Sequence, residues 1–336
     1  MRLIAAALVL LAFQIVSARA ADPDWLDPAL LAAAKGDGAA VIFSSVNEEE
    51  ELPQLQRFEE ATGIHVDYVR ASDTAIMARI AIEARAGKAA WDVVEIQAAE
   101  SIPKEQRLAY APPEAAHLMP GARDPEERWV GGYTVFHAPG YNTTKVAPAS
   151  LPQTYADFAK HQEWAGHVAI DYTDRDWLAG MFQFYGEDKG NALVQSIVAA
   201  LHPALYKGHL ALARALGSGE YWITLNNFVN LTINVKLAGG PVDYWVLEPV
   251  VVTYGQIAAN VQAPHPNAAK LLLNYLISAE AETMRTKWGR IPTRADVATN
   301  PPGIFAAFQA KKTVRAALSP AENEAWQKTF NALFKE

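Results

Sequence analysis

Residues 40–72 read AVIFSSVNEEEELPQLQRFEEATGIHVDYVRAS, and this stretch decides the fold class. A short apolar run leads into a polar segment that ends at Gly63, and a second apolar run follows at once. This order predicts a buried strand, a helix and a second strand. A further helix, with Asp73 as its N-cap and Gly87 past its end, and a strand over 91–98 continue the pattern. Strands and helices alternating at this spacing indicate parallel βαβ units.

The composition limits the classes of protein that the chain can belong to. It has 336 residues, of which 51% are hydrophobic, a length that normally forms two globular domains. The formal net charge is -8 and no basic stripe is present, which argues against nucleic acid as a partner. The chain contains no cysteine, so disulfides, thiolate metal sites and cysteine nucleophiles are excluded.

The first twenty residues have the pattern of a secretory signal. Arg2 gives a positive start, residues 3–16 are almost entirely apolar, and Ala18-Arg19-Ala20 has the small-x-small form of a cleavage site. The apolar run is shorter than the ~20 residues that a membrane-spanning helix needs. We therefore expect a cleaved signal peptide over residues 1–20 and an exported, periplasmic protein.

The rest of the chain predicts a second α/β unit placed inside the first one. Two strand-like segments, 135–141 and 244–251, would cross between the units, and the final helices would return to the first. A paired crossover between two α/β lobes makes a hinge over a ligand cleft. The predicted domains are a discontinuous first lobe over 21–138 and 250–336, and a second lobe over 139–249.

Several phrases, in this order along the chain, resemble a known family. They are AVIFSSVNEEEELPQLQRFEEATGIHVDYVRAS, AAWDVVEIQA, GYNTTKV with LPQTYADFA, WAGHVAIDYT, APHPNAAKLLLNYLISAEAE and GRIPTRADV. Together they look like the extracellular solute-binding proteins of bacterial ABC importers, in the branch that includes ferric-iron-binding proteins. The resemblance implies a two-lobed, type II periplasmic-binding-protein fold. Such a protein closes on a solute and presents it to an ABC permease in the inner membrane, without a cofactor and without catalysis; we expect it to act as a monomer.

The loop DYTDRDW, residues 171–177, raises three possibilities at the end of a predicted strand. It does not match a calcium loop, since the sixth position is Asp176 where an EF-hand has glycine. Asp174 or Asp176 can cap the helix that follows. An exported hydrolase that uses these two aspartates as its carboxylate pair remains an alternative. We expect the loop to form a cleft rim, with one aspartate capping.

Strand ends and the two crossovers supply the other candidate ligand-binding residues, because ligands bind at the carboxyl ends of parallel strands. The full set is Ser44, Ser45, Asn47, Arg70, Ser72, Gln97, Tyr141, Asn142, Tyr172, Asp174, Arg175, Trp177, Asn226, Asn227 and Glu248. No metal-binding motif is apparent, and the isolated His65 and His137 are interpreted as packed or surface residues.

The charge of the solute is ambiguous in the sequence. Arg70 and Arg175 suit an organic anion or a phosphorylated compound, which we favour. An amine would instead suit the carboxylates of Asp73, Asp174, Asp176 and Glu248. Ferric iron is the alternative that the resemblance suggests. However, Asn226-Asn227 stands where iron-binding relatives have a tyrosine pair, so we expect no stoichiometric iron. A periplasmic sensor that binds the solute and docks on a receptor is a third possibility.

Overall fold

The structure is a computed structural model that describes residues 23–334, and it is built around one ten-stranded mixed sheet. The predicted signal segment, residues 1–20, lies outside the described part. Within residues 23–334, no helix combines the length and the apolar character needed to cross a bilayer. The sheet order is β2-β1-β3-β9-β4-β7-β5-β6, with β10 beside β9 and β8 beside β4.

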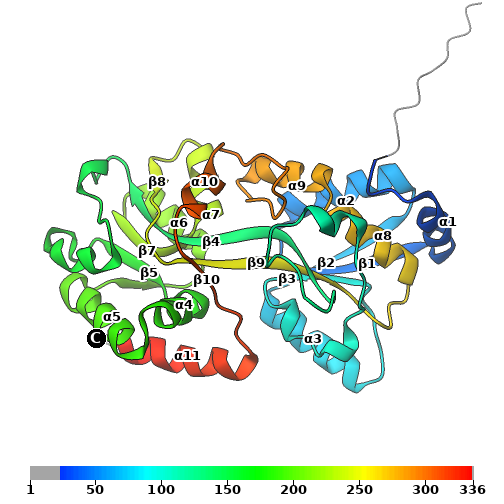
Figure 1. Ribbon diagram of the computed structural model, residues 1–336, viewed down its shortest axis with the longest axis horizontal. Coiled ribbons are helices and arrows are strands. Elements are labelled where there is room, and N and C mark those ends of the chain that lie inside the picture. Colours follow the sequence, from blue (N-terminus) through cyan, green and yellow to red (C-terminus); the bar gives the residue numbers. More distant parts are fainter. Residues whose placement is uncertain (1–22, 335–336) are drawn as a thin grey trace, which may run out of the picture.

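One end of the sheet holds the predicted βαβ units. Its three strands are parallel, with β1 between β2 and β3, and helices cover them (Figure 1). The strands are β1 (Ala39–Ser44), β2 (His65–Arg70) and β3 (Val93–Ile96). The helices are α1 (Pro28–Asp37), α2 (Glu48–Thr62), α3 (Asp73–Arg85), α8 (Pro266–Leu276) and α9 (Ala279–Arg285). We call this group of elements lobe 1.

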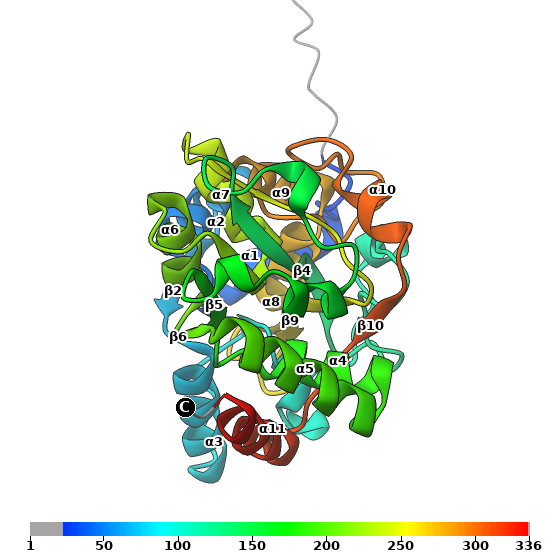
Figure 2. The ribbon, with the colours of Figure 1, turned by 90° about the vertical axis from the view of Figure 1, so that its left-hand side faces the viewer.

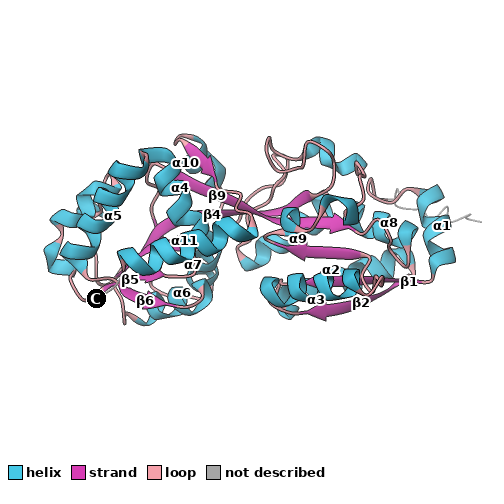
Figure 3. Cartoon of the chain, turned by 90° about the horizontal axis from the view of Figure 1, so that it is seen from below, coloured by secondary structure: helices cyan, strands magenta, loops and turns pink. Residues whose placement is uncertain are grey.

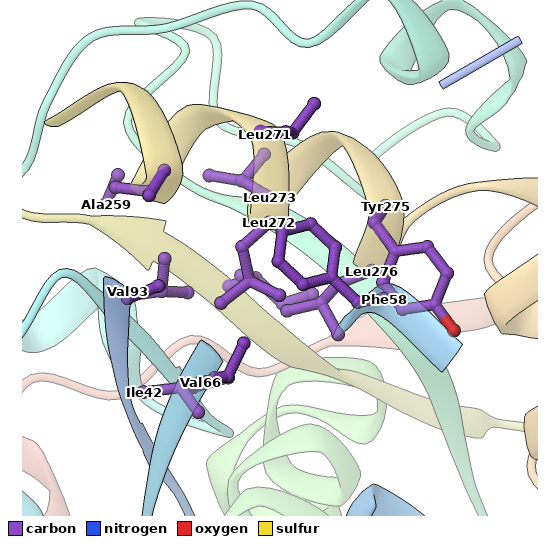
Figure 4. Close-up of a cluster of buried hydrophobic side chains, with 14 of the residues drawn as sticks. Ile42, Phe58, Val66, Val93, Ala259, Leu271, Leu272, Leu273, Tyr275 and Leu276 are labelled. Carbon is purple, nitrogen blue, oxygen red and sulfur yellow. The ribbon is translucent and has the colours of Figure 1, made fainter. Parts of the chain in front are cut away.

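The apolar core of lobe 1 explains why β1, β2 and β3 form where they do. Ile42, Val66 and Val93 face the same apolar cluster as Phe58 of α2 and Tyr275 of α8 (Figure 4). Helix α2 ends where the sequence predicts, because Gly63 adopts the left-handed conformation, φ 72°, and its N–H bonds to the Glu59 carbonyl. Because α2 ends at this point, the chain can enter β2, which pairs in parallel with β1.

The other end of the sheet is a second α/β group, which we call lobe 2. Strand β5 lies between β6 and β7, all parallel, and the helices of this lobe surround them (Figure 1). The strands are β5 (Val168–Asp171), β6 (Ala204–Tyr206), β7 (Ile223–Phe228) and β8 (Val242–Tyr244). The helices are α4 (Arg175–Tyr185), α5 (Glu187–Leu201), α6 (His209–Ser218) and α7 (Val229–Leu237).

Two long antiparallel strands join the lobes, β4 (Val130–Asn142) and β9 (Val250–Ala259). Figure 3 shows both running from one group of elements to the other. The first predicted crossover, 135–141, lies inside β4. The second lies further along the chain than predicted, since β9 begins at Val250 and Tyr244 ends β8 within lobe 2. Pro249 interrupts the β-rich stretch here, because proline cannot continue a strand's hydrogen-bond ladder.

The end of the chain does not stay in lobe 1, contrary to the predicted range 250–336. After α10 (Ile304–Gln309), β10 (Thr313–Arg315) pairs with β9 and leads to α11 (Pro320–Leu333). Helix α11 packs on α4 and α5 (Figures 1 and 2). Its Trp326 meets Phe182 edge-on at 5.2 Å, and Phe330 is buried in the core of lobe 2. This apolar face is the physical reason for the return.

Two local predictions are also corrected. Helix α3 is capped by Ser72, whose hydroxyl accepts from the Ala75 N–H, and Asp73 is its first residue. The helix predicted near Ser150 begins later, as a 3₁₀ helix after Thr154, which forms a capping box with Asp157. The 3₁₀ helices are Ala99–Ser101, Lys104–Gln106, Pro113–His117, Pro148–Ser150, Tyr155–Lys160, Gln162–Trp164 and Thr286–Trp288.

Candidate functional site

A cavity of about 460 Å3 lies between the lobes, against strand β9. Lobe 1 contributes the start of α3 and the segment that follows β3, while α4 and α11 close the other side. Figure 1 shows α3 and α11 on the same lower side of the molecule, at either side of this position. The lining residues are Asp73, Thr74, Met77, Gln97, Ala98, Glu100, Ser101, Arg175, Asp176, Thr253, Tyr254, Gln256, Arg315, Ala316, Leu318, Asn323, Glu324 and Gln327.

The loop 171–177 places one aspartate in this cavity and uses the other two for structure. Asp171 is buried and accepts hydrogen bonds from the Thr173 hydroxyl at 2.6 Å and the Gly208 N–H at 2.7 Å. Asp174 caps α4 by accepting from the Trp177 N–H at 3.0 Å, so the predicted cap is confirmed. Asp176 remains, in the first turn of α4, and it faces the cavity.

Asp174 also organises a buried polar network at the crossing of β4. Its Oδ2 lies 2.9 Å from His137 Nδ1 and accepts from Asn226 Nδ2 at 3.1 Å, while His137 Nε2 contacts the Thr253 hydroxyl at 3.3 Å. Burial alone would lower the pKa of His137, but the Asp174 carboxylate outweighs it and raises that pKa. Burial would likewise raise the pKa of Asp174, but His137 lowers it. Each group thus favours the charged form of the other, and their contact joins β4 to the start of α4.

A second histidine completes this network. His209, at the start of α6, stacks on Phe228 with the ring centroids 3.5 Å apart, and its Nε2 lies 3.7 Å from Asp174 Oδ2. Burial lowers the pKa of His209 despite the nearby carboxylates. The pKa values of the two histidines around Asp174 are thus shifted in opposite directions. Residues 23–334 contain no group of three or more histidine and carboxylate side chains arranged to hold a metal ion.

Two of the fifteen predicted ligand residues, Gln97 and Arg175, line the cavity. Arg175 is also engaged by α11, since its Nε donates to Asn323 Oδ1 at 2.9 Å and its Nη1 donates to Gln327 Oε1 at 3.0 Å. Tyr172 lies beside this contact, and its carbonyl accepts from Gln327 Nε2 at 3.2 Å. The loop 171–177 therefore both contacts α11 and contributes to the cavity wall.

The predicted residues of lobe 1 mostly serve local structure. Arg70 is exposed and donates to Asn47 Oδ1 at 3.2 Å, away from the cavity wall. The Ser44 hydroxyl is buried and accepts from the Val46 N–H at 3.1 Å. Ser72 is the cap of α3. Ser45 lies behind the wall, where its hydroxyl opposes the rise in the pKa of Asp73 that burial causes.

The predicted residues of lobe 2 and the crossovers are largely packed inside the protein. Tyr141 meets Trp245 edge-on at 5.8 Å in the core of lobe 2, and Trp177 belongs to the same core. Asn142 Nδ2 donates to the Leu216 carbonyl at 2.8 Å. None of these three lines the cavity.

Three further predicted ligand residues also lie outside the cavity wall. Asn226 bridges strand β5 and the helix cap, because it donates to the Asp171 carbonyl and to Asp174. Asn227 Nδ2 donates to the Thr232 hydroxyl at 3.0 Å. Glu248 lies just before β9 and accepts from the Lys312 N–H at 3.2 Å. Amides at strand ends here satisfy the protein's own donors and acceptors.

Most residues of the cavity wall are not among the predicted ligand-binding residues. Tyr254 and Gln256 come from β9, Arg315 from β10, and Asn323 from α11. Alternation along β9 marks residues that share one face, but no local pattern shows that α11 closes the cavity. The sequence predicts Asp73 as a helix cap and as a residue that suits an amine, but it does not place Asp73 among the ligand-binding residues.

Comparison with known proteins identifies the family. The model of the bacterial extracellular solute-binding protein family matches residues 54–316. The chain belongs to this family. The Fe(3+)-binding periplasmic protein of Serratia marcescens is 27% identical over 197 residues, which are 56% of either chain. This solute-binding protein therefore matches about half the length of that curated relative.

Solved structures show the same fold at low sequence identity. The substrate-binding protein of an ABC transporter from Agrobacterium tumefaciens has a TM-score of 0.74 at 17% identity, covering 90% of this chain and 97% of its own. Iron-bound HitA from Pseudomonas aeruginosa has a TM-score of 0.71 at 16% identity, covering 88% and 98%. AfuA from Actinobacillus pleuropneumoniae, with fructose-6-phosphate bound, has a TM-score of 0.71 at 18% identity, with the same coverage. The predicted periplasmic-binding-protein fold is confirmed.

Proposed function

We propose that this solute-binding protein is the periplasmic component of an ABC importer, which captures a small polar solute in the cavity between the lobes. It delivers the solute to a permease in the inner membrane and acts as a monomer, exported by residues 1–20. The observation that carries the proposal is the cavity itself, because its walls come from both lobes and from the strand β9 that joins them. Clefts between lobes are a common place for small ligands.

Capture in such a cavity depends on a difference in affinity between two arrangements of the lobes. A solute that touches both walls binds the closed arrangement better than an open one, and only that difference shifts the population. Gln97 on lobe 1 and Asp176 on lobe 2 supply polar groups on opposite walls. Contacts with both lobes are therefore the physical requirement for a transport role.

A thermal-shift screen of the mature protein against a solute library tests the proposal. A ligand at ~100 times its dissociation constant stabilises the folded state by roughly 2.7 kcal/mol, which such an assay detects easily. We expect at least one small polar solute to raise the melting temperature. A folded, homogeneous preparation that no solute in a broad library stabilises would count against the proposed function.

Ferric iron is the second candidate, because the curated relative and several of the similar structures bear names that refer to iron. Two observations on the described residues disfavour it. They contain no cluster of histidine and carboxylate ligands suited to a metal, and Asn226 and Asn227 are engaged in internal hydrogen bonds. The hydrolase alternative loses its carboxylate pair, since Asp174 is buried and bonded to His137 and to the helix cap. Turnover of any substrate, abolished by Asp176→Asn, would revive it.

A further inference from the structure

The charges that line the cavity are predominantly negative, and its two positive groups are already engaged. Four carboxylates, from Asp73, Glu100, Asp176 and Glu324, stand on the wall together with two arginines. Arg315 forms an ion pair with Glu100, with 2.6 Å between Nη2 and Oε2. Its guanidinium also lies over the Trp129 ring, 5.0 Å from the centroid. Both arginines therefore have partners within the protein, one of them a carboxylate.

On the lobe 1 wall, Asp73 has an unsatisfied carboxylate oxygen. Its Oδ1 is buried and has no hydrogen-bond partner in the described structure, while its Oδ2 accepts only a long bond, 3.4 Å, from the Gln97 N–H. A buried acceptor without a partner costs free energy, roughly 1–3 kcal/mol, more when it is charged. The Ser45 hydroxyl opposes the rise in the pKa of Asp73 that burial causes, but no cation among residues 23–334 pairs with this carboxylate.

On the opposite wall, Asp176 is part-buried and its carboxylate also has no cation beside it among the described residues. No hydrogen bond or ion pair to its carboxylate is formed within residues 23–334. Burial and the neighbouring Asp174 raise the pKa of Asp176 to about 6, even though His137 and Arg175 oppose that rise. A carboxylate in such low-polarity surroundings is stabilised by a paired cation. Each lobe thus presents one uncompensated carboxylate to the same cavity.

We propose that the solute is a small organic cation, an amine or guanidine compound, whose positive group or groups are held between Asp73 of lobe 1 and Asp176 of lobe 2. The inference rests on the proposed function and names the substrate class for the same cavity. The apolar lining from Met77, Tyr254 and Leu318 suits the hydrocarbon part of such a molecule. A cation that bridges the two carboxylates also binds the closed arrangement selectively.

The geometry gives no comparable support to an anion, which the sequence favours on account of Arg70 and Arg175. Arg70 lies outside the cavity, and Arg175 is bonded to two amide oxygens of α11. An uncharged polyol could donate hydrogen bonds from its hydroxyls to the two carboxylates, so it is the main alternative to a cation. A polyol would not neutralise their charge, and this difference separates the two classes in an experiment.

The experiment measures binding of matched probes to the mature protein at pH 7.5. The cationic probes are α,ω-diaminoalkanes of three to six carbons, an aminoalkylguanidine and a quaternary ammonium compound; the matched probes are diols and dicarboxylates of equal length. We expect the tightest ligand to be a cation, and we expect Asp73→Asn and Asp176→Asn each to weaken it at least tenfold. The matched control is Asp188→Asn, an exposed aspartate in the first turn of α5 outside the cavity, with a change of less than threefold.

Binding of the cation should also depend on pH. Asp176 must be ionised to pair with it, so affinity should fall at least fivefold from pH 7.5 to pH 5, as the pH passes through the raised pKa of that group. The charged groups that act on Asp176 are Asp174, His137, Arg175 and Glu100. The Asp176→Asn variant should lose most of this dependence.

The outcomes that overturn the inference are distinct from those that overturn the proposed function. No cationic probe binding, a cation indifferent to both aspartates, or a dicarboxylate or diol binding most tightly would each refute the organic-cation assignment. An anionic or uncharged ligand that is lost in Ala98→Trp, which fills the cavity, would leave the solute-binding function intact. Only the absence of any ligand in a broad library counts against that function itself.

Discussion

Replacing Asp176 by asparagine should stabilise the ligand-free protein at neutral pH. The carboxylate is part-buried against the cavity without a hydrogen-bond partner among the described residues, and Asp174 adds a second negative charge nearby. Asparagine keeps the shape of the side chain and cannot ionise. The substitution therefore removes a charge whose compensation, in our account, comes from the solute.

The size of the effect follows from the pKa of Asp176, about 6 in the folded protein. An unfolded chain has an aspartate pKa near ~3.9, and one unit is worth ~1.36 kcal/mol, so the upper limit is about 3 kcal/mol. Because folding raises this pKa, the unfolded state ionises first, and stability falls as the pH rises from about 4 to about 6. We expect Asp176→Asn to gain about 1–3 kcal/mol at pH 7.5 and almost nothing at pH 4.

Urea denaturation at the two pH values measures this gain, with unchanged slopes as the condition for comparing midpoints. The control is Asp188→Asn, which removes an exposed aspartate from the equivalent turn of α5 and should not raise stability. Equal or lower stability of Asp176→Asn at pH 7.5, or the same gain at pH 4, would show that the Asp176 carboxylate is compensated within the protein and refute the reasoning.

Three other predictions test the remaining parts of the structure. Arg175→Ala should lower stability by about 1–3 kcal/mol and speed amide exchange in α11, because two hydrogen bonds from a charged group are lost; unchanged stability with tenfold weaker binding would instead make it a direct ligand contact. Arg285→Met should cost about 3–5 kcal/mol in urea, since it leaves Glu95 buried without its partner, whereas Arg57→Met at a half-exposed pair should cost less than about 1 kcal/mol. Protein mixed with ferric citrate and desalted should carry far less than one iron per chain, without a visible tyrosinate band; stoichiometric, coloured iron would contradict us.

The sequence predicts the alternating elements well, because the signals for them are local. Apolar runs of strand length, a capping serine or aspartate and a helix-ending glycine such as Gly63 act over a few residues. The nesting of one α/β unit inside the other follows from the order of these elements. The strand β4 lies where the first crossover was predicted for the same reason.

The composition of the cavity wall could not be predicted in the same way. Asp73 and Asn323 line one cavity but are 250 positions apart, and only the packing of α11 brings them together. Residue type was also misleading at strand ends. An asparagine such as Asn226 satisfies the backbone as readily as it binds a solute, and the sequence does not distinguish the two uses.

The most direct test of the account compares the wild-type protein with Ala98→Trp in isothermal titration calorimetry, using the tightest ligand from the solute screen. Ala98 lies on the cavity wall in the turn that follows β3, where an indole would occupy the space between the lobes. The account predicts saturable binding of one solute per chain in the wild type and a loss of at least a hundredfold in the folded variant. Unchanged affinity in Ala98→Trp would place the solute elsewhere and contradict the central claim.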